Sequence, residues 1–479
     1  MVEKFENYID GAWRSATSYS QNINPSNTDD IVGEYAQASE ADLNDAVRSA
    51  KEAFAEWSLS GLLQRHEVLS KTAHLIRERK NDLGRLLSRE EGKTLPEGIG
   101  EVMRAAQVFD FFAGEVLRLS GEKLASVRPN VEVEVTREPL GVIGIITPWN
   151  FPIAIPAWKM APALAYGNCL VIKPANLAPA CTHALIDILV EAGAPKGVVN
   201  LVMGSGRVVG QAMVDHPDIE AITFTGSDVT GKNIAESCVR SGKKVQAEMG
   251  GKNPLVVLDD ANLDTAVECA LNGAYFSTGQ RCTASSRLIV EKGIYDDFVK
   301  ALQARIDGLT VGDALADGTH IGPLADENQL QKSLSYVEIG QEEGARLVCG
   351  GEEVKTDTPG YFLKPALFAD VKNDMRIAQE EIFGPVACAI KAEDFDHALT
   401  LANDTEFGLS SGICTTNLEK ATKFKRQAQA GMVMVNLPTA GVDFHVPFGG
   451  RKGSSYGPRE QGRYAAEFYT TVKTSYIGV

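Results

Sequence analysis

One of the eight cysteines lies in a segment whose residue types suit a reactive thiol. Cys282 belongs to Ser277–Ala284 (STGQRCTA), where a glycine permits an unusual backbone path and small residues flank the sulfur. The neighbouring Arg281 is expected to favour the thiolate, which is the nucleophilic form of cysteine. The segment therefore predicts a nucleophile at Cys282, although taken alone it fits a buried core cysteine equally well.

Two further polar residues lie where a backbone can approach a ligand. Glu248 precedes Met249–Pro254 (MGGKNP), whose paired glycines leave room for close approach, and its carboxylate can act as a general base for water. Asn150, in Thr147–Pro152 (TPWNFP), follows an apolar strand, and ligands of α/β sheets bind beyond such strand ends. Its amide can donate to a developing oxyanion. The alternatives are a helix-end carboxylate and a turn asparagine.

The segment Phe224–Gly231 (FTGSDVTG) follows another predicted strand and opens a helix. Its two glycines do not form the dinucleotide pattern GxGxxG, and the Gly-Lys-Ser/Thr of phosphate-binding loops is missing from it. The amides of a helix N-terminus after a strand nevertheless suit a pyrophosphate, so the segment is a candidate phosphate site.

The composition is that of a globular protein with an acidic balance. Of 479 residues, 44% are hydrophobic and 23% charged, and the net charge of −16 argues against nucleic acid as a partner. The N-terminal stretch Met1–Ile9 is polar and does not resemble a signal peptide. The most apolar window, Pro139–Trp158, contains too many helix-breaking residues for a membrane span. We therefore expect a soluble, cytoplasmic protein with no membrane partner.

The cysteine spacing argues against a metal or dithiol centre. No two cysteines form a CxxC pair, so neither a zinc knuckle nor a dithiol redox motif is expected, and no metal site is predicted. Most cysteines lie in apolar company, as Cys169 does in Gly167–Val171, and are expected to be core residues with reduced thiols.

Helices and short apolar strands alternate along the chain, which predicts α/β layers over parallel sheets. Apolar residues at helical spacing predict helices at Glu40–Trp57, Leu62–Leu87 and Thr182–Ala192. Apolar runs predict buried strands at Gly141–Ile146, Cys169–Ile172, Val198–Val202, Ala221–Phe224, Pro254–Leu258, Arg287–Val290, Val386–Ile390 and Met432–Val435. The rhythm restarts after Gly251, so two α/β units split near residue 250 are expected. Alternating residues predict exposed antiparallel strands at Val131–Arg137 and Phe468–Ile477.

Taken together, these segments resemble the NAD(P)-dependent aldehyde dehydrogenase superfamily from about Tyr8 to Tyr476. The likeness extends to Lys173–Ala175 (KPA), Glu380–Pro385 (EEIFGP) and Pro447–Gly450 (PFGG). No single motif decides it, but six of them in one order are specific. The resemblance implies two parallel open-sheet α/β domains and a small antiparallel arm. The implied divisions are a dinucleotide-binding domain at 1–118 and 140–248, a catalytic domain at 249–463, and an oligomerisation arm at 119–139 and 464–479.

The resemblance also implies a mechanism for oxidising an aldehyde to a carboxylate. Cys282 would attack the aldehyde carbon, and the Asn150 side chain and the Cys282 amide would hold the oxyanion of the thiohemiacetal. Hydride transfer to NAD or NADP would leave a thioester, which water activated by Glu248 would hydrolyse. Glu460 matches a carboxylate sometimes proposed as a proton relay.

The family's cofactor contacts carry over to several loops. Ser227 matches a residue near the phosphates, Glu381 one that binds the nicotinamide ribose, and Phe383 one that packs beside the nicotinamide. The predicted cofactor-binding residues are Thr147, Trp149, Lys173, Ala175, Asn176, Gly206, Gly210, Phe224, Gly226, Ser227, Glu381 and Phe383.

One of these positions bears on the choice of coenzyme. Family members that prefer NAD often carry a glutamate three residues after the lysine that matches Lys173, and it repels the 2′-phosphate of NADP. Here the residue is Asn176, so we expect NADP to be accepted. The alternative is that Asn176 simply caps a helix and leaves NAD dominant.

The substrate is indicated only by the late segment Gly441–Glu460, which resembles that of the α-ketoglutaric semialdehyde dehydrogenases. Their substrate, 2,5-dioxopentanoate, has an anionic tail, which a guanidinium binds well. Arg104 and Arg281 match arginines that hold anionic substrates in related enzymes, although Arg104 fits a surface salt bridge nearly as well. Trp158 stands where succinate semialdehyde enzymes often place an arginine, and it equally suits an apolar tunnel for uncharged aldehydes.

The sequence also bears on two other functional classes and on the oligomeric state. A cysteine hydrolase would need a histidine base, and only His445 of the seven histidines lies near a motif. A non-catalytic binding protein on the same fold would be signalled by loss of Cys282, Glu248 or Asn150, and all three are present. The exposed strands and the family resemblance predict a homodimer or homotetramer.

Overall fold

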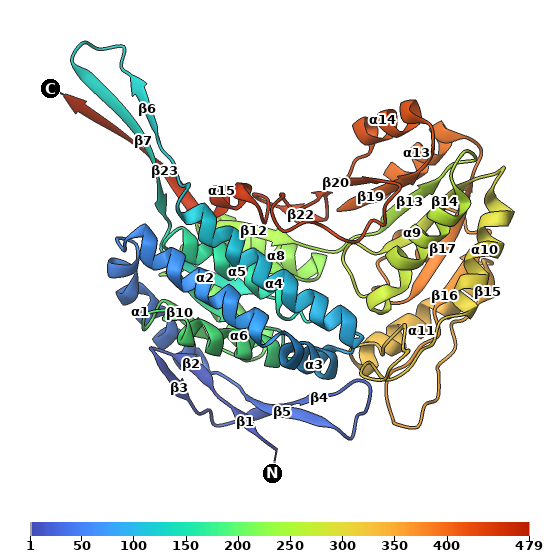
Figure 1. Ribbon diagram of the computed structural model, residues 1–479, viewed down its shortest axis with the longest axis horizontal. Helices are drawn as coiled ribbons and strands as arrows, with labels where there is room; N and C mark the ends of the chain where they lie inside the picture. Colours follow the sequence, from blue (N-terminus) through green and yellow to red (C-terminus); the bar gives the residue numbers. More distant parts are fainter. Residues whose placement is uncertain (1, 479) are drawn as a thin grey trace.

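The computed structural model describes residues 2–478, which build two open α/β sheets that lie next to each other (Figure 1). The first sheet has eight strands in the order β22-β12-β11-β8-β9-β10-β2-β3, and its five central strands are parallel. Its strands are β2 (Asn7–Ile9), β3 (Ala12–Arg14), β8 (Val142–Ile146), β9 (Cys169–Lys173), β10 (Val199–Leu201), β11 (Ala221–Thr225), β12 (Lys244–Glu248) and β22 (Ser455–Tyr456).

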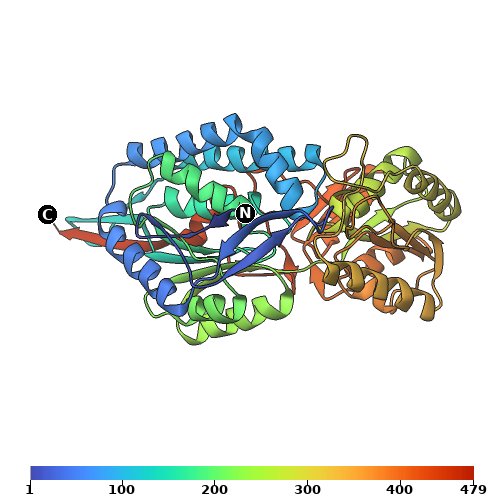
Figure 2. The ribbon, with the colours of Figure 1, turned by 90° about the horizontal axis from the view of Figure 1, so that it is seen from below.

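Helices cover both faces of the eight-stranded sheet, as Figure 2 shows. One face carries α2 (Leu62–Glu78), α3 (Lys80–Glu91), α4 (Leu95–Val116), α5 (Ala154–Ala165) and α6 (Ala180–Glu191). The other carries α1 (Glu40–Trp57), α7 (Gln211–Asp215), α8 (Asp228–Arg240) and a π-helical turn, Gly206–Gly210. The central strands are therefore buried on both sides, which is why they read as continuous apolar runs.

The second sheet has seven strands in the order β15-β16-β17-β14-β13-β19-β20, and only β15 runs antiparallel to its neighbour. Its strands are β13 (Asn253–Val257), β14 (Ser285–Glu291), β15 (Arg346–Cys349), β16 (Ala366–Ala369), β17 (Val386–Ala392), β19 (Ser410–Cys414) and β20 (Met432–Val435). The surrounding helices are α9 (Leu263–Tyr275), the 3₁₀ turn η2 (Phe276–Gly279), α10 (Tyr295–Asp307), α11 (Glu327–Glu342), α12 (Arg376–Gln379), α13 (Phe395–Asn403) and α14 (Leu418–Gln427).

Three small sheets complete the fold. An antiparallel ribbon of β6 (Glu122–Ala125), β7 (Val131–Pro139) and β23 (Thr470–Gly478) projects from the body (Figure 1). The others pair β1 (Lys4–Phe5), β4 (Tyr19–Ile23) and β5 (Ile31–Ala36), and β18 (Phe407–Gly408) with β21 (Arg451–Lys452). The turn η3 (Arg463–Ala465) and α15 (Ala466–Tyr469) lead into β23.

Parallel α/β sheets with small antiparallel ones are the fold class that the sequence predicts, but some boundaries were wrong. The predicted helix Leu62–Leu87 is two helices, because Arg79 leaves the helical region with φ −97° and ψ 12°. The predicted strand at Phe468 begins at Thr470, because the preceding residues form α15. None of the helices between residues 2 and 478 combines the length and hydropathy that a bilayer span requires.

Candidate active site

Cys282 lies in the loop between η2 and β14, and the backbone of this loop is unusual. Ser277 and Thr278 have left-handed φ values of 52° and 56°, which cost free energy for residues with a side chain. Gly279 is required there, because a Cβ would meet the Gly384 carbonyl oxygen at 2.3 Å. The Asn253 amide donates to the Cys282 carbonyl at 2.8 Å, which fixes the loop beside the nucleophile.

The electrostatic surroundings of Cys282 differ from the expectation. Burial, followed by the charges of Glu248 and Glu381, raises the pKa of the Cys282 thiol to about 12. Arg281 does not assist, because its guanidinium donates to Glu97 Oε1 at 3.2 Å and to Ser277 Oγ at 3.0 Å. The prediction that Arg281 favours the thiolate was therefore wrong. Ionisation of this thiol needs a base close by.

Glu248 ends strand β12, opposite Ser455 of β22. Its Oε2 accepts a hydrogen bond from Ser455 Oγ at 2.5 Å, while Oε1 has no hydrogen-bond partner among residues 2–478. Burial, and then the nearby charge of Glu460, raises the pKa of the Glu248 carboxyl well above its ordinary value. A buried carboxyl with a raised pKa is a stronger base than an ordinary carboxylate, and its free oxygen is available to accept a proton.

Asn150 lies in the loop after β8, at the carboxyl edge of the eight-stranded sheet. Its side-chain amide donates to the Gln280 carbonyl at 2.9 Å, so it reaches the loop that carries Cys282. The second hydrogen of the same amide is not used by that bond. The structure thus brings Asn150 and Cys282 together from two different sheets.

Glu460 and a lysine that the sequence analysis missed form a buried pair. Glu460 accepts from Lys159 Nζ, and the same ammonium donates to Thr223 Oγ1 at 2.8 Å. Glu460 Oε2 has no partner in the part of the chain described. A signal was present in the sequence, because Lys159 is the one charged residue of the apolar segment Ala154–Ala165, and a buried charge needs a partner.

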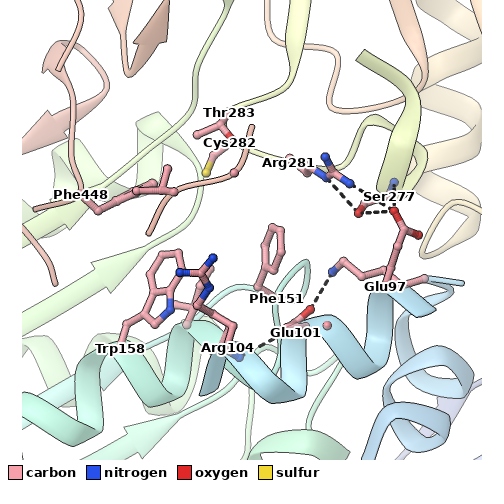
Figure 3. Close-up of a pocket in the computed structure, with 16 residues that line it drawn as sticks. Glu97, Glu101, Arg104, Phe151, Trp158, Ser277, Arg281, Cys282, Thr283 and Phe448 are labelled. Atoms are coloured by element: carbon pink, nitrogen blue, oxygen red, sulfur yellow. Dashed lines mark hydrogen bonds and ion pairs between the residues drawn. The ribbon is translucent and has the colours of Figure 1, made fainter. Parts of the chain in front are cut away.

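Two cavities open on either side of Cys282. The first encloses about 270 Å³ and contains the thiol together with Arg104, Trp158 and Arg281 (Figure 3). Phe151, Ile155, Val442 and Phe448 supply most of its apolar wall. All three residues predicted to contact substrate therefore line one cavity with the nucleophile.

The two arginines of this cavity differ in the contacts that their guanidinium groups already make. Arg281 is paired with Glu97, as described above. Arg104 is half-buried, its Nη1 meets no acceptor within residues 2–478, and its guanidinium carbon lies 6.0 Å from the Phe444 ring centre. Burial lowers its pKa, and the charge of Asp443 offsets this in part. Arg104 is thus not the surface salt bridge of the alternative interpretation.

The second cavity, of about 160 Å³, is also lined by Cys282, together with Asn150. The Trp149 and Phe383 rings meet edge to face at 5.5 Å in its wall, and Glu381 Oε1 accepts from the Gly251 amide at 2.7 Å. Five of the predicted cofactor residues line it: Trp149, Gly226, Ser227, Glu381 and Phe383. Gln329 and Lys332, which α11 contributes to this wall, were not predicted from the sequence.

The other predicted cofactor residues lie around the carboxyl ends of β8, β9, β10 and β11, outside that cavity. Lys173 is buried with its pKa lowered to about 8, and Gly210 faces it, with an added Cβ only 3.7 Å from Cδ. Asn176 is exposed, and it does not cap α6, whose N-cap is Pro179. The remaining members are Thr147, Ala175, Gly206 and Phe224.

Residues that hold the site together were also missed. Lys93 donates to the Asn150 carbonyl, and Glu97 and Glu101 of α4 contact the loops on either side. The Thr94-x-x-Glu97 pattern of a helix capping box could be read from the sequence. The contact of Glu97 with Ser277 across the site could not.

Comparison with known proteins agrees with this arrangement. The pattern of the "Aldehyde dehydrogenase family" matches residues 13–475. An alpha-ketoglutaric semialdehyde dehydrogenase of Bacillus subtilis is 44% identical, over 98% of this chain and 97% of that protein.

Two solved structures share the fold over almost the whole chain. A betaine aldehyde dehydrogenase of Staphylococcus aureus, solved with NAD+, superposes with a TM-score of 0.96 at 34% identity, covering 99% of this chain and 95% of its own. An NADP-dependent enzyme of E. coli superposes with a TM-score of 0.96 at 35% identity, covering 100% and 98%. With these likenesses and the site just described, the chain belongs to the aldehyde dehydrogenase family and is an NAD(P)-dependent enzyme that oxidises a small aldehyde.

Proposed function

We propose that the enzyme oxidises a short semialdehyde with an anionic tail, of which 2,5-dioxopentanoate is the leading candidate. The observation that carries the proposal is Arg104, whose buried Nη1 has no acceptor within residues 2–478 and which lines the same cavity as Cys282. A buried guanidinium group without an acceptor costs free energy that a substrate carboxylate would recover. The semialdehyde dehydrogenase of Bacillus subtilis supports this choice.

The proposed chemistry assigns one role to each buried polar group. The Cys282 thiol gives up its proton to water, and its sulfur attacks the aldehyde carbon to form a thiohemiacetal. The free hydrogen of the Asn150 amide and the Cys282 amide hold the oxyanion. Glu248 then takes a proton from the water that hydrolyses the thioester, and the Glu460–Lys159 pair passes the proton onward.

The second cavity fits the cofactor. When bound, NAD or NADP accepts the hydride that leaves the thiohemiacetal carbon. Thr225 Oγ1 and Gln329 Oε1, a donor and an acceptor beside this cavity, have no partner among the described residues, so the cavity can satisfy polar ligand groups. Trp149, Ser227 and Glu381 would hold the ribose and phosphates, and α8 directs its first amides there.

A cationic substrate is the main competitor, because a solved relative is a betaine aldehyde dehydrogenase. A trimethylammonium tail would face the guanidinium of Arg104, and like charges at close range are unfavourable. Uncharged aldehydes fit the apolar wall around Trp158 and Phe448, but they would leave Arg104 without a partner. Both alternatives therefore leave the Arg104 guanidinium without a favourable partner, whereas an anionic tail supplies one.

Replacing Arg104 by leucine should impair only anionic substrates. A charge-assisted contact is worth about 1.5–3 kcal/mol, so kcat/KM for 2,5-dioxopentanoate should fall about ten- to hundredfold. The kcat/KM for hexanal should stay within about threefold, because leucine keeps the wall apolar. Steady-state rates on 2,5-dioxopentanoate, succinate semialdehyde, glyceraldehyde 3-phosphate, hexanal and benzaldehyde measure both effects.

The matched control is Arg118→Leu, since Arg118 follows α4 and pairs only with Glu115 on the surface. It should change none of these rates. The proposal is wrong if hexanal or benzaldehyde is the best substrate of the wild-type enzyme, or if Arg104→Leu leaves the anionic substrates unaffected.

We propose that the enzyme accepts NADP as well as NAD as its coenzyme. Asn176 is exposed and donates to Gln37 Oε1 at 3.3 Å, so a 2′-phosphate there would meet an amide instead of a carboxylate. Asn176→Glu should restore the repulsion and lower kcat/KM for NADP at least about fivefold, with little change for NAD. A wild-type preference for NAD above a hundredfold would contradict this.

We also propose that the enzyme is a homodimer or homotetramer joined through the ribbon β6-β7-β23. Both outer strands of this ribbon have free edges, and Val472, Tyr476 and Ile477 of β23 expose apolar side chains. Sedimentation at micromolar concentration should give a dimer or tetramer, and a monomer would refute the proposal.

Unpaired cysteines throughout residues 2–478 support a reducing, cytoplasmic setting.

A further inference from the structure

The first turns of α4, which carry Glu97 and Glu101 (Figure 3), contact both the loop that carries Cys282 and the segment that follows Asn150. These loops come from different sheets: Cys282 precedes β14 of the seven-stranded sheet, and Asn150 follows β8 of the eight-stranded sheet. No strand pairing fixes the distance between them. Side chains therefore set the separation of the two oxyanion donors: Asn150 itself donates to the Gln280 carbonyl, and two acids of α4 reach the two loops.

Glu97 reaches the first of these loops. Its Oε1 accepts from the Ser277 amide at 2.8 Å, from Ser277 Oγ at 3.0 Å and from Arg281 Nη2 at 3.2 Å. Its Oε2 accepts from Thr94 Oγ1 at 2.9 Å and so caps α4 itself. The helix thus fixes Glu97, and Glu97 fixes the strained turn five residues before the nucleophile.

Glu101, one helical turn further along, reaches the second loop. Its Oε1 accepts from the Ile153 and Ala154 amides, both at 3.1 Å, at the start of α5. Its Oε2 accepts from Lys93 Nζ at 3.0 Å, and Lys93 in turn donates to the Asn150 carbonyl. The Lys93 ammonium also lies 4.0 Å from the Phe151 ring centre, so Lys93 contacts both the Asn150 backbone and the side chain of the next residue.

We propose that Glu97 and Glu101 are positioning residues that together set the geometry of the oxyanion site. Each holds one donor loop against the same rigid helix, so a shift of either side chain changes the distance between the Cys282 amide and the Asn150 side chain. This inference rests on the proposed roles of Cys282 and Asn150. It gives a role to the buried pair of Lys93 and Glu101 and to the partly buried Glu97 beside the first cavity.

Removing either charge should slow chemistry without weakening coenzyme binding. In Glu101→Gln the amide nitrogen cannot accept from Lys93. In Glu97→Gln the amide nitrogen replaces one carboxylate oxygen, so the donors on that oxygen, either Ser277 and Arg281 or Thr94, lose their acceptor. A misplacement near 1 Å costs about a hundredfold, and removal of an oxyanion donor about 10²–10³-fold. We expect the rate constant for forming reduced cofactor in a single turnover to fall at least about fivefold in each variant.

The experiment mixes excess enzyme and NAD or NADP with 2,5-dioxopentanoate and follows absorbance at 340 nm. Glu115→Gln is the matched control, because Glu115 lies on the same helix and pairs only with Arg118. At saturating enzyme concentration the limiting substrate sets the amplitude, so a partial loss of folded protein changes neither the amplitude nor the rate constant, whereas mispositioning lowers the rate constant itself. Coenzyme dissociation constants from fluorescence should stay within about twofold of the wild-type values.

The proposal is overturned if the rate constant of either variant falls by less than fivefold. If Glu101→Gln or Glu97→Gln yields no folded enzyme, Lys93→Met removes the link from Glu101 to the Asn150 carbonyl, and Ser277→Ala removes the hydroxyl link to Glu97; both are held to the same threshold. Cys282→Ala separates the two claims: reduced cofactor formed by that variant would contradict the proposed function instead.

Discussion

Replacing Cys282 by alanine is expected to reduce kcat by on the order of 10⁴-fold or more, with no reduced cofactor formed even in a single turnover. Without the sulfur no thiohemiacetal forms, and the remaining groups of the site cannot hold the aldehyde carbon in its place. Absorbance at 340 nm measures turnover, and fluorescence quenching measures coenzyme binding. Binding should persist, because the second cavity keeps its other walls.

Cys349→Ala is the control for this variant. Cys349 is the other cysteine that is not fully buried, and it lies on β15, away from both cavities. Its replacement should leave kcat unchanged. A Cys282→Ala enzyme with more than about one per cent of wild-type turnover would show that the nucleophile has been misassigned.

Replacing Glu248 by glutamine is expected to spare hydride transfer more than hydrolysis. The first turnover should produce reduced cofactor, and steady turnover should then fall by at least about 10²-fold, because the thioester has lost its general base. Gln keeps the size of the side chain and still accepts from Ser455. Stopped-flow absorbance should therefore show a burst followed by a nearly flat line.

The pH dependence gives a second test of Glu248. Burial and Glu460 raise its pKa, so below that pKa the carboxyl is protonated and cannot take a proton from water. Steady turnover of the wild type should therefore rise with pH through this raised pKa. The residual rate of Glu248→Gln should lack that rise, and an unchanged pH profile in the variant would exclude Glu248 as the base.

The sheets were predictable where strands are apolar and buried on both faces. The predicted strands at Cys169, Ala221 and Met432 lie within a residue of those observed. Strand β12 was missed because Gln246 and Glu248 interrupt its apolar run, although both are buried in the structure. A buried polar strand is stabilised by partners that are remote in sequence, so local periodicity cannot reveal it.

The site was less predictable than the fold, for the same reason. Motifs located Cys282, Glu248 and Asn150, but the contact between Glu97 and Ser277 joins residues 180 positions apart. Arg281 looked available beside the cysteine, whereas in the structure it is already paired with Glu97. Which arginine has a free donor is a property of three-dimensional neighbours, and it distinguishes Arg104 from Arg281.

The central claim is that an aldehyde with an anionic tail is oxidised through a thioester on Cys282. Mass spectrometry of peptides from Glu248→Gln enzyme, quenched in acid after mixing with 2,5-dioxopentanoate and NADP, tests it most directly. The account predicts that the peptide containing Cys282 gains the mass of the acyl group, and that it does so only when the coenzyme is present. An acyl group on another residue, or unmodified Cys282 after reduced cofactor has formed, would contradict the account.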